Sequence, residues 1–387
     1  MWTAVVGGSI HRAETRVSAA KSQRATRVMP DQRRKDQRKA LLMMRFAMGW
    51  PGSFTCRSVY WTGPVRVCGR KTAWYKNSMR DDYTPRPAVA RWLLDADPAI
   101  RWQVMRDLTG EAADTIAVER SRVATEGWGA ELLARQGDDG SWECGWQWDL
   151  TTLWSLVVLK DLGLDPTSDE ARRMIDRVDG GLVFKPLNNR PFLNGETEPC
   201  INGRILGVGA YFKEPNDALA DQLLGEQLED GGWNCEAPKS PRSSFHTTIC
   251  VLEGLLAFER AGRKTPAVTE ARRRAEEYLL ERGMFRSLRT GEVVDKRWLR
   301  FAYPTFWHYD VLRGLDYLRE AGIMPEGRVA EAIEVVIKRR HQNGRWPLNF
   351  LHPEQIPLRM ETGVGRASRW NTLRALRVVD WYYGTKG

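Results

Sequence analysis

Apolar residues recur every three or four positions through most of the chain between Pro85 and Tyr383. This spacing is typical of helices that bury one face, and we find no convincing alternation of the kind that marks a half-buried strand. The pattern predicts helices over residues 88–94, 99–108, 112–125 and 128–135. Beyond them, helices are expected to alternate with loops rich in Gly, Asp and Pro. The sequence therefore predicts an all-α protein built of helical hairpins.

A polar turn recurs along the chain. Residues 136–142 read Gln-Gly-Asp-Asp-Gly-Ser-Trp, and residues 227–233 read Gln-Leu-Glu-Asp-Gly-Gly-Trp. Residues 342–346 are a shortened third copy, and degenerate copies are expected at 180–212 and near Gly283. Repeats with a period between about 20 and 50 residues usually form stacked helical hairpins. These turns are therefore expected to recur with the hairpins.

An apolar pair brings the predicted inner helices into one register: Ile205-Leu206, Val251-Leu252, Val311-Leu312 and Ala375-Leu376. Five residues before these pairs stand Cys200, His246, Phe306 and Trp370. Equal register implies an equal facing direction if the hairpins close into a ring. Cys200 and His246 are therefore expected to approach each other. Both fall in the first turn of a helix, because Pro199 suits the first helical position and Ser244 suits the N-cap.

A zinc site is the functional interpretation of this approach. Glu198 lies two residues before Cys200, and a carboxylate, a thiolate and an imidazole form a donor set that zinc accepts. The helix N-terminus is expected to lower the pKa of Cys200 and so favour its thiolate. The alternative is that His246 bonds a nearby carbonyl group and that Cys200 is a small core residue. Cys235 lies in a predicted loop and could substitute as a ligand, whereas His308 is out of register with His246 and is expected to face elsewhere.

Charge is unevenly distributed along the 387 residues. The net charge is +10, but residues 1–80 hold 17 Lys and Arg against 3 Asp and Glu, and the rest of the chain is slightly acidic. Residues 1–82 are therefore expected to form a basic, unstructured tail, with Met79 as a sensible alternative start. A basic arm that binds nucleic acid or anionic lipid is the other interpretation of this segment. The acidic remainder gives no footprint for nucleic acid.

Cysteine spacing and hydropathy limit the cellular setting. The six cysteines form no Cys-x-x-Cys pair, which favours a reduced, cytoplasmic environment. No apolar run reaches the length of about 18 residues that a membrane span needs, so none is predicted. Peripheral membrane contact and a second protein subunit stay open as partners.

These motifs resemble the terpenoid cyclase and protein prenyltransferase superfamily over roughly residues 127–383. The two Gln/Trp turns resemble the repeats of squalene–hopene cyclases. Residues 239–250, which contain His246, resemble the segment of prenyltransferase β subunits that carries a zinc-binding histidine. The residues Glu198-Pro199-Cys200 resemble the Asp-x-Cys zinc ligands of those subunits.

The resemblance implies both a fold and a function. The fold would be an α/α toroid of about five to six hairpins over residues 127–387, with N-terminal helices at 83–126 packed on it. Its inner helices would enclose an apolar cavity for an isoprenoid. Zinc would be held at the cavity mouth by Glu198, Cys200 and His246, with Cys200 at the centre where related transferases activate a thiol. The cavity lining would include Trp154, Phe306 and Trp370.

The chain also departs from the motifs of the superfamily. It has no Asp-x-Asp-Asp acid, which argues against a proton-initiated cyclase of the squalene–hopene type. The basic positions that help prenyltransferases hold a diphosphate are Phe192 and Gly195 here. Helix N-termini could substitute for them. So could arginines at other positions, namely Arg190, Arg204, Arg242, Arg300 and Arg369.

Three functions therefore compete. The first is an enzyme that handles an isoprenoid or another apolar substrate with zinc. The second is a cyclase-like enzyme with a different acid, for which the candidates are Asp149, His308, Tyr309 and Asp310. The third is a non-catalytic toroid that binds a lipid or a protein partner on its concave surface. Stoichiometric zinc would favour the first function, and a cavity filled by side chains would favour the third.

Overall fold

The computed structural model describes residues 86–144 and 148–384, without the side chains of residues 148 and 149. The predicted basic tail, the alternative start at Met79 and the side chain of Asp149 lie outside these described residues. Short helices stand at the four positions predicted near the start of the repeats, and they are α3 (Pro87–Leu94), α4 (Pro98–Val104), α5 (Ala113–Ser121) and α6 (Gly127–Leu133).

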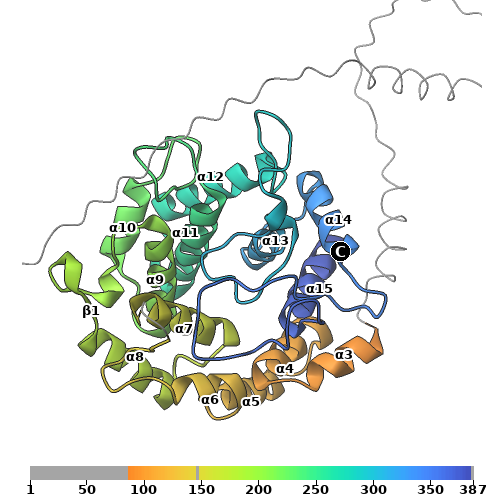
Figure 1. The fold of residues 1–387 in the computed structure, drawn as a ribbon, viewed down its shortest axis with the longest axis horizontal. Helices are drawn as coiled ribbons and strands as arrows, with labels where there is room; N and C mark the ends of the chain where they lie inside the picture. The colour runs from red at the N-terminus through yellow and green to blue at the C-terminus, as the bar shows by residue number, and fades with distance from the viewer. Residues whose placement is uncertain (1–85, 145–147, 385–387) are drawn as a thin grey trace, which may run out of the picture. The chain divides into compact units, whose positions relative to one another are not determined.

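The longer helices form an inner ring surrounded by an outer ring (Figure 1). The inner helices are α7 (Trp148–Leu162), α9 (Pro199–Phe212), α11 (Phe245–Phe258), α13 (Val311–Glu320) and α15 (Arg369–Tyr383). The outer helices are α8 (Asp169–Gly181), α10 (Asp217–Gly225), α12 (Pro266–Glu281) and α14 (Ala330–Lys338). The predicted class, an all-α toroid, is confirmed.

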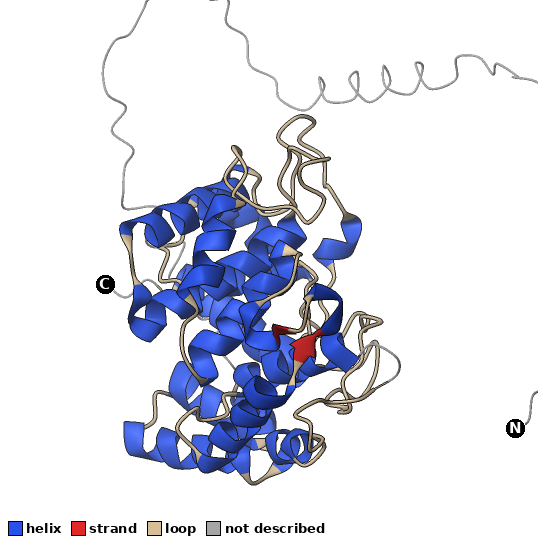
Figure 2. Cartoon of the chain, turned by 90° about the vertical axis from the view of Figure 1, so that its left-hand side faces the viewer, coloured by secondary structure: helices blue, strands red, loops and turns tan. Residues whose placement is uncertain are grey.

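Paired strands are confined to one small hairpin within the described ranges (Figure 2). The strands β1 (Val183–Phe184) and β2 (Arg190–Pro191) run antiparallel in the loop between α8 and α9. As for helices, none in the described part of the chain combines the length and the apolar character that crossing a membrane requires.

The first helices of the described chain close the ring. Helix α4 packs against α15, and α3 to α6 occupy the arc between α15 and α7 (Figure 1). Arg377 of α15 donates from Nη2 to Oε1 of Gln103 in α4 at 2.7 Å, across 274 positions of sequence. Arg369 donates to the backbone carbonyl of Asp95 at 3.0 Å. Through these contacts, the first helices of the described chain pack against the last one.

Each Gln/Trp turn ties an outer helix to the next hairpin. In the second copy, the buried Trp233 donates from Nε1 to the carbonyl of Leu223 in α10 at 2.6 Å. Its backbone N–H donates to Oγ1 of Thr248 in α11 at 3.1 Å. The side chain of Gln227 reaches onward and donates to the carbonyl of Ala271 in α12 at 2.8 Å. One turn therefore fixes three helices.

The third copy of the turn is not shortened, which corrects the sequence alignment. Trp346 donates from Nε1 to the carbonyl of Val336 at 2.7 Å, as Trp142 does to Leu132 of α6 and Trp233 does to Leu223 of α10. Arg340 stands six residues before Trp346 and donates to the carbonyl of Gly344 at 3.4 Å. It takes the structural place of the glutamine, and Gln342 does not.

Helix α13 begins later than the shared register predicts. Asp310 is its N-cap, and one carboxylate oxygen accepts the backbone N–H of Arg313 at 2.7 Å. Phe306 therefore lies in the preceding loop, where its φ of 50° is incompatible with a right-handed helix. His308 also lies in this loop, so the helical argument that turned it away from His246 does not apply.

Helices α9 and α11 approach each other at two glycines. A Cβ atom on Gly203 would lie 2.6 Å from the carbonyl oxygen of Cys250. A Cβ atom on Gly254 would lie 2.2 Å from the carbonyl oxygen of Gly203. Only hydrogen fits at these positions, so the backbones of the two helices touch. Pro199 begins α9 and Ser244 caps α11, as predicted.

Candidate functional site

A central cavity of about 730 Å³ lies between the inner helices. Its lining is rich in ionisable side chains, and the basic ones outnumber the acidic ones. The basic residues are Arg106, Arg120, Lys160, Arg204, Arg260, Arg313, Arg319, Arg374 and Arg377. The acidic residues are Asp107, Asp161, Glu253, Asp316 and Glu320. The cavity therefore carries an excess of positive charge.

Four of these arginines are buried: Arg204, Arg313, Arg374 and Arg377. We call them the floor arginines. Glu253 of α11 accepts from Arg204 and, at 2.8 and 2.7 Å, from Arg313, so one carboxylate serves two guanidinium groups. Burial and the nearby charge of Arg313 lower the pKa of Arg204 to about 10, which keeps it positive at neutral pH.

Two further carboxylates are shared in the same way. Asp316 accepts from Arg319 at 2.8 Å and lies 3.6 Å from Nε of Arg374. Asp107 lies 2.6 Å from Nε of Arg106 and 2.5 Å from Nη2 of Arg377. After this sharing, Arg204 Nε, Arg374 Nη1 and Arg377 Nε have no hydrogen-bond partner. The cavity floor thus holds donors that no acceptor of the protein satisfies.

Apolar and aromatic groups complete the lining, which includes Trp102, Tyr211, Leu256, Tyr303 and Trp370. Trp370 stacks on Tyr303, with ring centroids 4.4 Å apart. Trp154 and Phe306 pack edge to face at 5.6 Å and are buried, and neither is among the described residues that line this cavity. Of the three aromatic residues expected there, the structure thus brings Trp370 to the cavity.

The shared register holds a signal for the floor arginines that the sequence analysis did not use. The residue after the apolar pair lines the cavity in three of the four aligned helices, as Glu253, Arg313 and Arg377. Lys160 lines it from the same position in α7, after the pair Val158-Leu159. The residue before the pair is an arginine in two of the aligned helices, Arg204 and Arg374. Charged residues that flank an apolar pair within an inner helix therefore mark the lining.

Only one of the arginines suggested for diphosphate binding lies in the cavity. Arg204 is that residue. Arg190, Arg242 and Arg300 are exposed, and Arg369 is engaged with the backbone of α3 and its C-cap.

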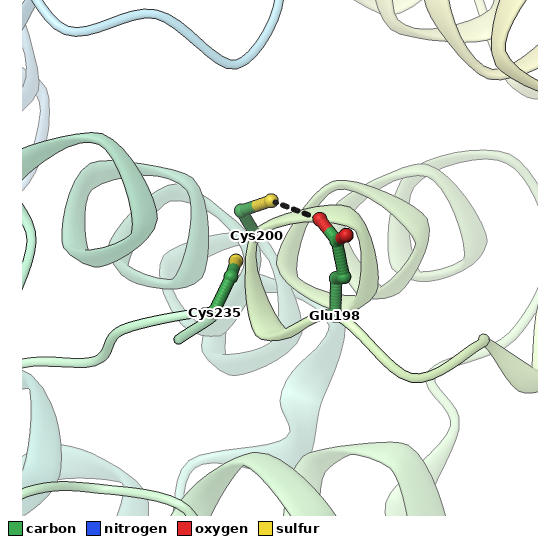
Figure 3. A group of neighbouring side chains, drawn as sticks. All are labelled: Glu198, Cys200 and Cys235. Atoms are coloured by element: carbon green, nitrogen blue, oxygen red, sulfur yellow. Dashed lines mark hydrogen bonds between the residues drawn. The ribbon is translucent and has the colours of Figure 1, made fainter. Parts of the chain in front are cut away.

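A second group, the thiol cluster, consists of Glu198, Cys200 and Cys235 (Figure 3). Their donor atoms lie within 4.8 Å of one another, and Sγ of Cys200 lies 3.6 Å from Oε2 of Glu198. Glu198 and Cys200 come from the start of α9, and Cys235 comes from the loop before α11. The structure therefore joins two of the three predicted zinc ligands and adds the cysteine that was named as a substitute.

Of the two thiols in this cluster, Cys235 has the lowered pKa, whereas Cys200 was expected to have it. The pKa of Cys200 is raised, first by its hydrogen bond to Cys235 and then by burial. The pKa of Cys235 is lowered, chiefly by the same hydrogen bond. The prediction that the helix N-terminus lowers the pKa of Cys200 is therefore wrong, because its neighbours outweigh the helix dipole.

The third group is the histidine cluster, which consists of His246, His308, His352 and Glu354. The ring centroids of His246 and His308 lie 5.8 Å apart, so the expectation that His308 faces elsewhere is wrong. His308 Nε2 lies 2.9 and 3.0 Å from the two oxygens of Glu354, and its ring stacks on His352 at 3.7 Å. His352 and Glu354 are in the long loop between α14 and α15, and no sequence motif marks them.

His246 faces this cluster, and it is not part of the thiol group. Its Nδ1 accepts the backbone N–H of Tyr309 at 2.8 Å. A neutral imidazole that accepts at Nδ1 carries its hydrogen on Nε2. Burial, and then the charge of His308, lowers the pKa of His246 to about 4, so the ring is neutral at pH 7.

The remaining acid candidates have structural partners. Tyr309 is buried, and its hydroxyl group donates to the carbonyl of Met284 at 2.6 Å. Asp310 caps α13 with one oxygen, and its other oxygen, Oδ2, is buried without a partner. Burial raises the pKa of both side chains. Asp310 therefore keeps one buried carboxylate oxygen without a hydrogen bond, whereas the hydroxyl group of Tyr309 is bonded.

No family model matches this chain, and no curated protein matches it. Among solved structures, it is similar to a protein from Actinoplanes at 16% identity, over 81% of this chain and 99% of that chain, with a TM-score of 0.37. It is also similar to the type II terpene cyclase MstE from Scytonema at 16% identity, over 73% of this chain and 88% of that chain, with a TM-score of 0.36. Both likenesses are distant.

Proposed function

We propose that the protein binds a small molecule of the isoprenoid diphosphate class in its central cavity, with the diphosphate on the floor arginines. The observation that carries this proposal is the excess of basic over acidic side chains in the cavity lining, nine against five. Burying positive charge that is incompletely paired costs several kcal/mol. An anionic ligand would supply the missing negative charge and accept charge-assisted hydrogen bonds from arginines of the lining.

Helix ends do not account for these arginines. Lys160, Arg260 and Arg319 lie at or just beyond the C-terminal ends of inner helices, where a positive charge offsets the helix dipole. Arg204 and Arg374 lie in the middle turns of α9 and α15, far from either end. A ligand therefore explains the floor arginines better than the dipoles do.

The apolar part of the lining favours a ligand with a hydrocarbon portion. Trp102, Leu256 and Trp370 face the same cavity as the arginines. An isoprenoid diphosphate joins an anionic end to an apolar chain and so fits both kinds of wall. A purely apolar substrate would leave the excess positive charge of the lining without a counter-charge.

Calorimetric titration of the full chain tests this proposal. Farnesyl diphosphate is expected to bind more tightly than inorganic diphosphate, and farnesol is expected to show no measurable binding. Diphosphate release is followed in the same samples, to learn whether the ligand is turned over. Equal binding of farnesol and farnesyl diphosphate would contradict a role for the arginines.

Two variants with a matched control sharpen the test. Arg204→Gln and Arg374→Gln are each expected to weaken farnesyl diphosphate binding about 10-fold or more, since a hydrogen bond to a charged group contributes about 1.5–3 kcal/mol. Each change leaves Glu253 or Asp316 with its second arginine, so the fold should persist. Arg289→Gln removes an exposed arginine outside the cavity and should leave binding unchanged.

We further propose zinc at the thiol cluster, with Glu198, Cys200 and Cys235 as donors. Tetrahedral zinc with one sulfur and one oxygen ligand separates those atoms by roughly 3.6 Å. The distance between Cys200 Sγ and Glu198 Oε2 is 3.6 Å, which fits. Oγ1 of Thr247 lies 3.4 Å from Sγ of Cys235 and would orient that thiolate. Zinc at such a site acts as a Lewis acid.

Metal analysis of the full chain tests this second proposal. Loss of one zinc per chain in Cys200→Ser/Cys235→Ser would support the cluster. Retention of that zinc in Cys235→Ser alone, with Cys200→Ser and His246→Ala each removing it, would instead support the ligand set implied by the resemblance. If none of these variants changes the zinc content, zinc has no place at these residues.

A further inference from the structure

Part of the histidine cluster forms a second set of metal donors, separate from the thiol cluster. His308, His352 and Glu354 each offer one donor atom, and these atoms lie within 4.8 Å of one another. They come from two loops that are far apart in sequence, one before α13 and one between α14 and α15. Two imidazoles and one carboxylate form a donor set typical of divalent transition metals.

The distances are close to those around a bound ion. His308 Nε2 lies 2.9 and 3.0 Å from the two oxygens of Glu354. Two such ligands on a tetrahedral ion are separated by roughly 3.4 Å. An outward shift of a few tenths of an ångström would therefore make room for the metal.

Surrounding residues hold these donors in place. Trp307 donates from Nε1 to Oε1 of Glu354 at 2.5 Å. Arg313 donates from Nη1 to the backbone carbonyl of His308 at 2.7 Å. Hydrogen bonds from outer residues to ligands are typical of protein metal sites. The side chains of His308 and Glu354 are 17% and 15% exposed, so the site is sheltered but reachable from solvent.

One ring has to move for a metal to bind. The rings of His308 and His352 are stacked 3.7 Å apart, with an angle of 3° between their planes. A metal lies near the plane of each imidazole that binds it, so two parallel stacked rings cannot both face one ion. The ring of His308 is held by its hydrogen bonds to Glu354, whereas the ring of His352 is held by stacking, so His352 is the ring that would rotate.

We propose that His308, His352 and Glu354 form a binding site for a divalent transition metal, which joins the loop between α14 and α15 to the start of α13. Three protein donors leave a fourth position for water, as in catalytic zinc centres. This site does not depend on ligand binding in the cavity or on zinc at the thiol cluster.

Cobalt(II) titration of the full chain tests the site in a background without the thiol cluster. The protein is stripped with a chelator and carries Cys200→Ser/Cys235→Ser. It is expected to bind one cobalt per chain, with weak visible d–d bands and no sulfur charge-transfer band. His352→Ala and Glu354→Gln, each added to this background, are expected to weaken cobalt binding at least about 10-fold.

His341→Ala in the same background is the matched control, because His341 is exposed and outside the cluster. It should bind cobalt like its parent. Circular dichroism shows whether each variant is folded, and Glu354→Gln preserves side-chain shape if His352→Ala unfolds. The proposal would be overturned if the double-cysteine background failed to bind cobalt. It would also be overturned if His352→Ala and Glu354→Gln bound cobalt as tightly as that background does.

Discussion

At the scale of single residues, the floor arginines and their shared carboxylates decide how the cavity responds to mutation. Glu253 is the acceptor for two buried guanidinium groups, whereas each arginine is one of two donors to it. Replacing Glu253 removes the partner of two arginines, whereas replacing one arginine leaves Glu253 with the other. The two replacements are therefore expected to differ in their effect on stability, although each deletes one charge.

Glu253→Gln is expected to lower the free energy of unfolding by about 3 kcal/mol, because Arg204 and Arg313 lose their charged partner in a buried site. Arg204→Gln is expected to change it by less than about 1 kcal/mol, since Glu253 keeps Arg313. Urea unfolding measures both values. Equal losses for the two variants would mean that Arg204 is needed for the fold itself.

A second residue gives the stability a dependence on pH. Burial raises the pKa of Glu361 from 4.5 to about 7, against hydrogen bonds from Ser368 and the backbone of Trp370. The folded state therefore binds this proton more tightly than the unfolded state. Its contribution to stability is complete below pH 4.5 and is lost as pH rises through about 7.

Glu361→Gln should remove this contribution, which amounts to at most about 3 kcal/mol. The wild type is expected to lose stability relative to Glu361→Gln between pH 4.5 and 7. Urea unfolding at a series of pH values tests the difference, with the exposed Glu229→Gln as control. Parallel pH profiles for wild type and Glu361→Gln would contradict the raised pKa.

At the scale of elements, the contact between α9 and α11 depends on two glycines. Gly203→Ala would place a methyl group 2.6 Å from the carbonyl oxygen of Cys250, and backbone cannot yield as a side chain can. Its expected cost is about 1–3 kcal/mol or more. Gly180→Ala is the matched control in α8, where nothing lies within 4 Å. It should raise stability by about 0.5–1 kcal/mol, since alanine favours a helix.

The same two variants distinguish packing from propensity. The melting temperature should fall for Gly203→Ala and rise for Gly180→Ala. If both changes raise the melting temperature, the two inner helices are not in backbone contact.

Elements with local signals could be predicted from the sequence. Helix α9 begins at Pro199 and α11 is capped by Ser244, because proline and serine act on their own helix ends. The start of α13 could not be predicted from the shared register, because Asp310 caps the helix four residues beyond Phe306. The pairing of His308 with His352 and Glu354 could not either, because those residues lie in a loop whose path depends on the rest of the fold.

At the scale of the whole molecule, closure of the ring couples its first and last helices. Ile100 of α4 is fully buried, and α4 packs against α15. Ile100→Ala is expected to cost about 2–5 kcal/mol. We expect it to speed amide hydrogen exchange in α15 as well as in α4, because the two helices stabilise each other.

Mass spectrometry of the exchanging protein resolves the two helices. Val118→Ala serves as the control, because Val118 is 61% exposed in the adjacent α5. Faster exchange in α4 alone would mean that the ring opens there without disturbing α15.

Closure by the last helix also affects the protein while it is being made. Arg377 is translated 274 positions after Gln103, its partner in α4. Until then, the side of α4 that α15 covers has no partner on the nascent chain. Incomplete chains with uncovered apolar surface are prone to aggregate. The ring therefore stays incomplete for most of translation. Chaperones that shield nascent chains would have to protect α4 for the longest time.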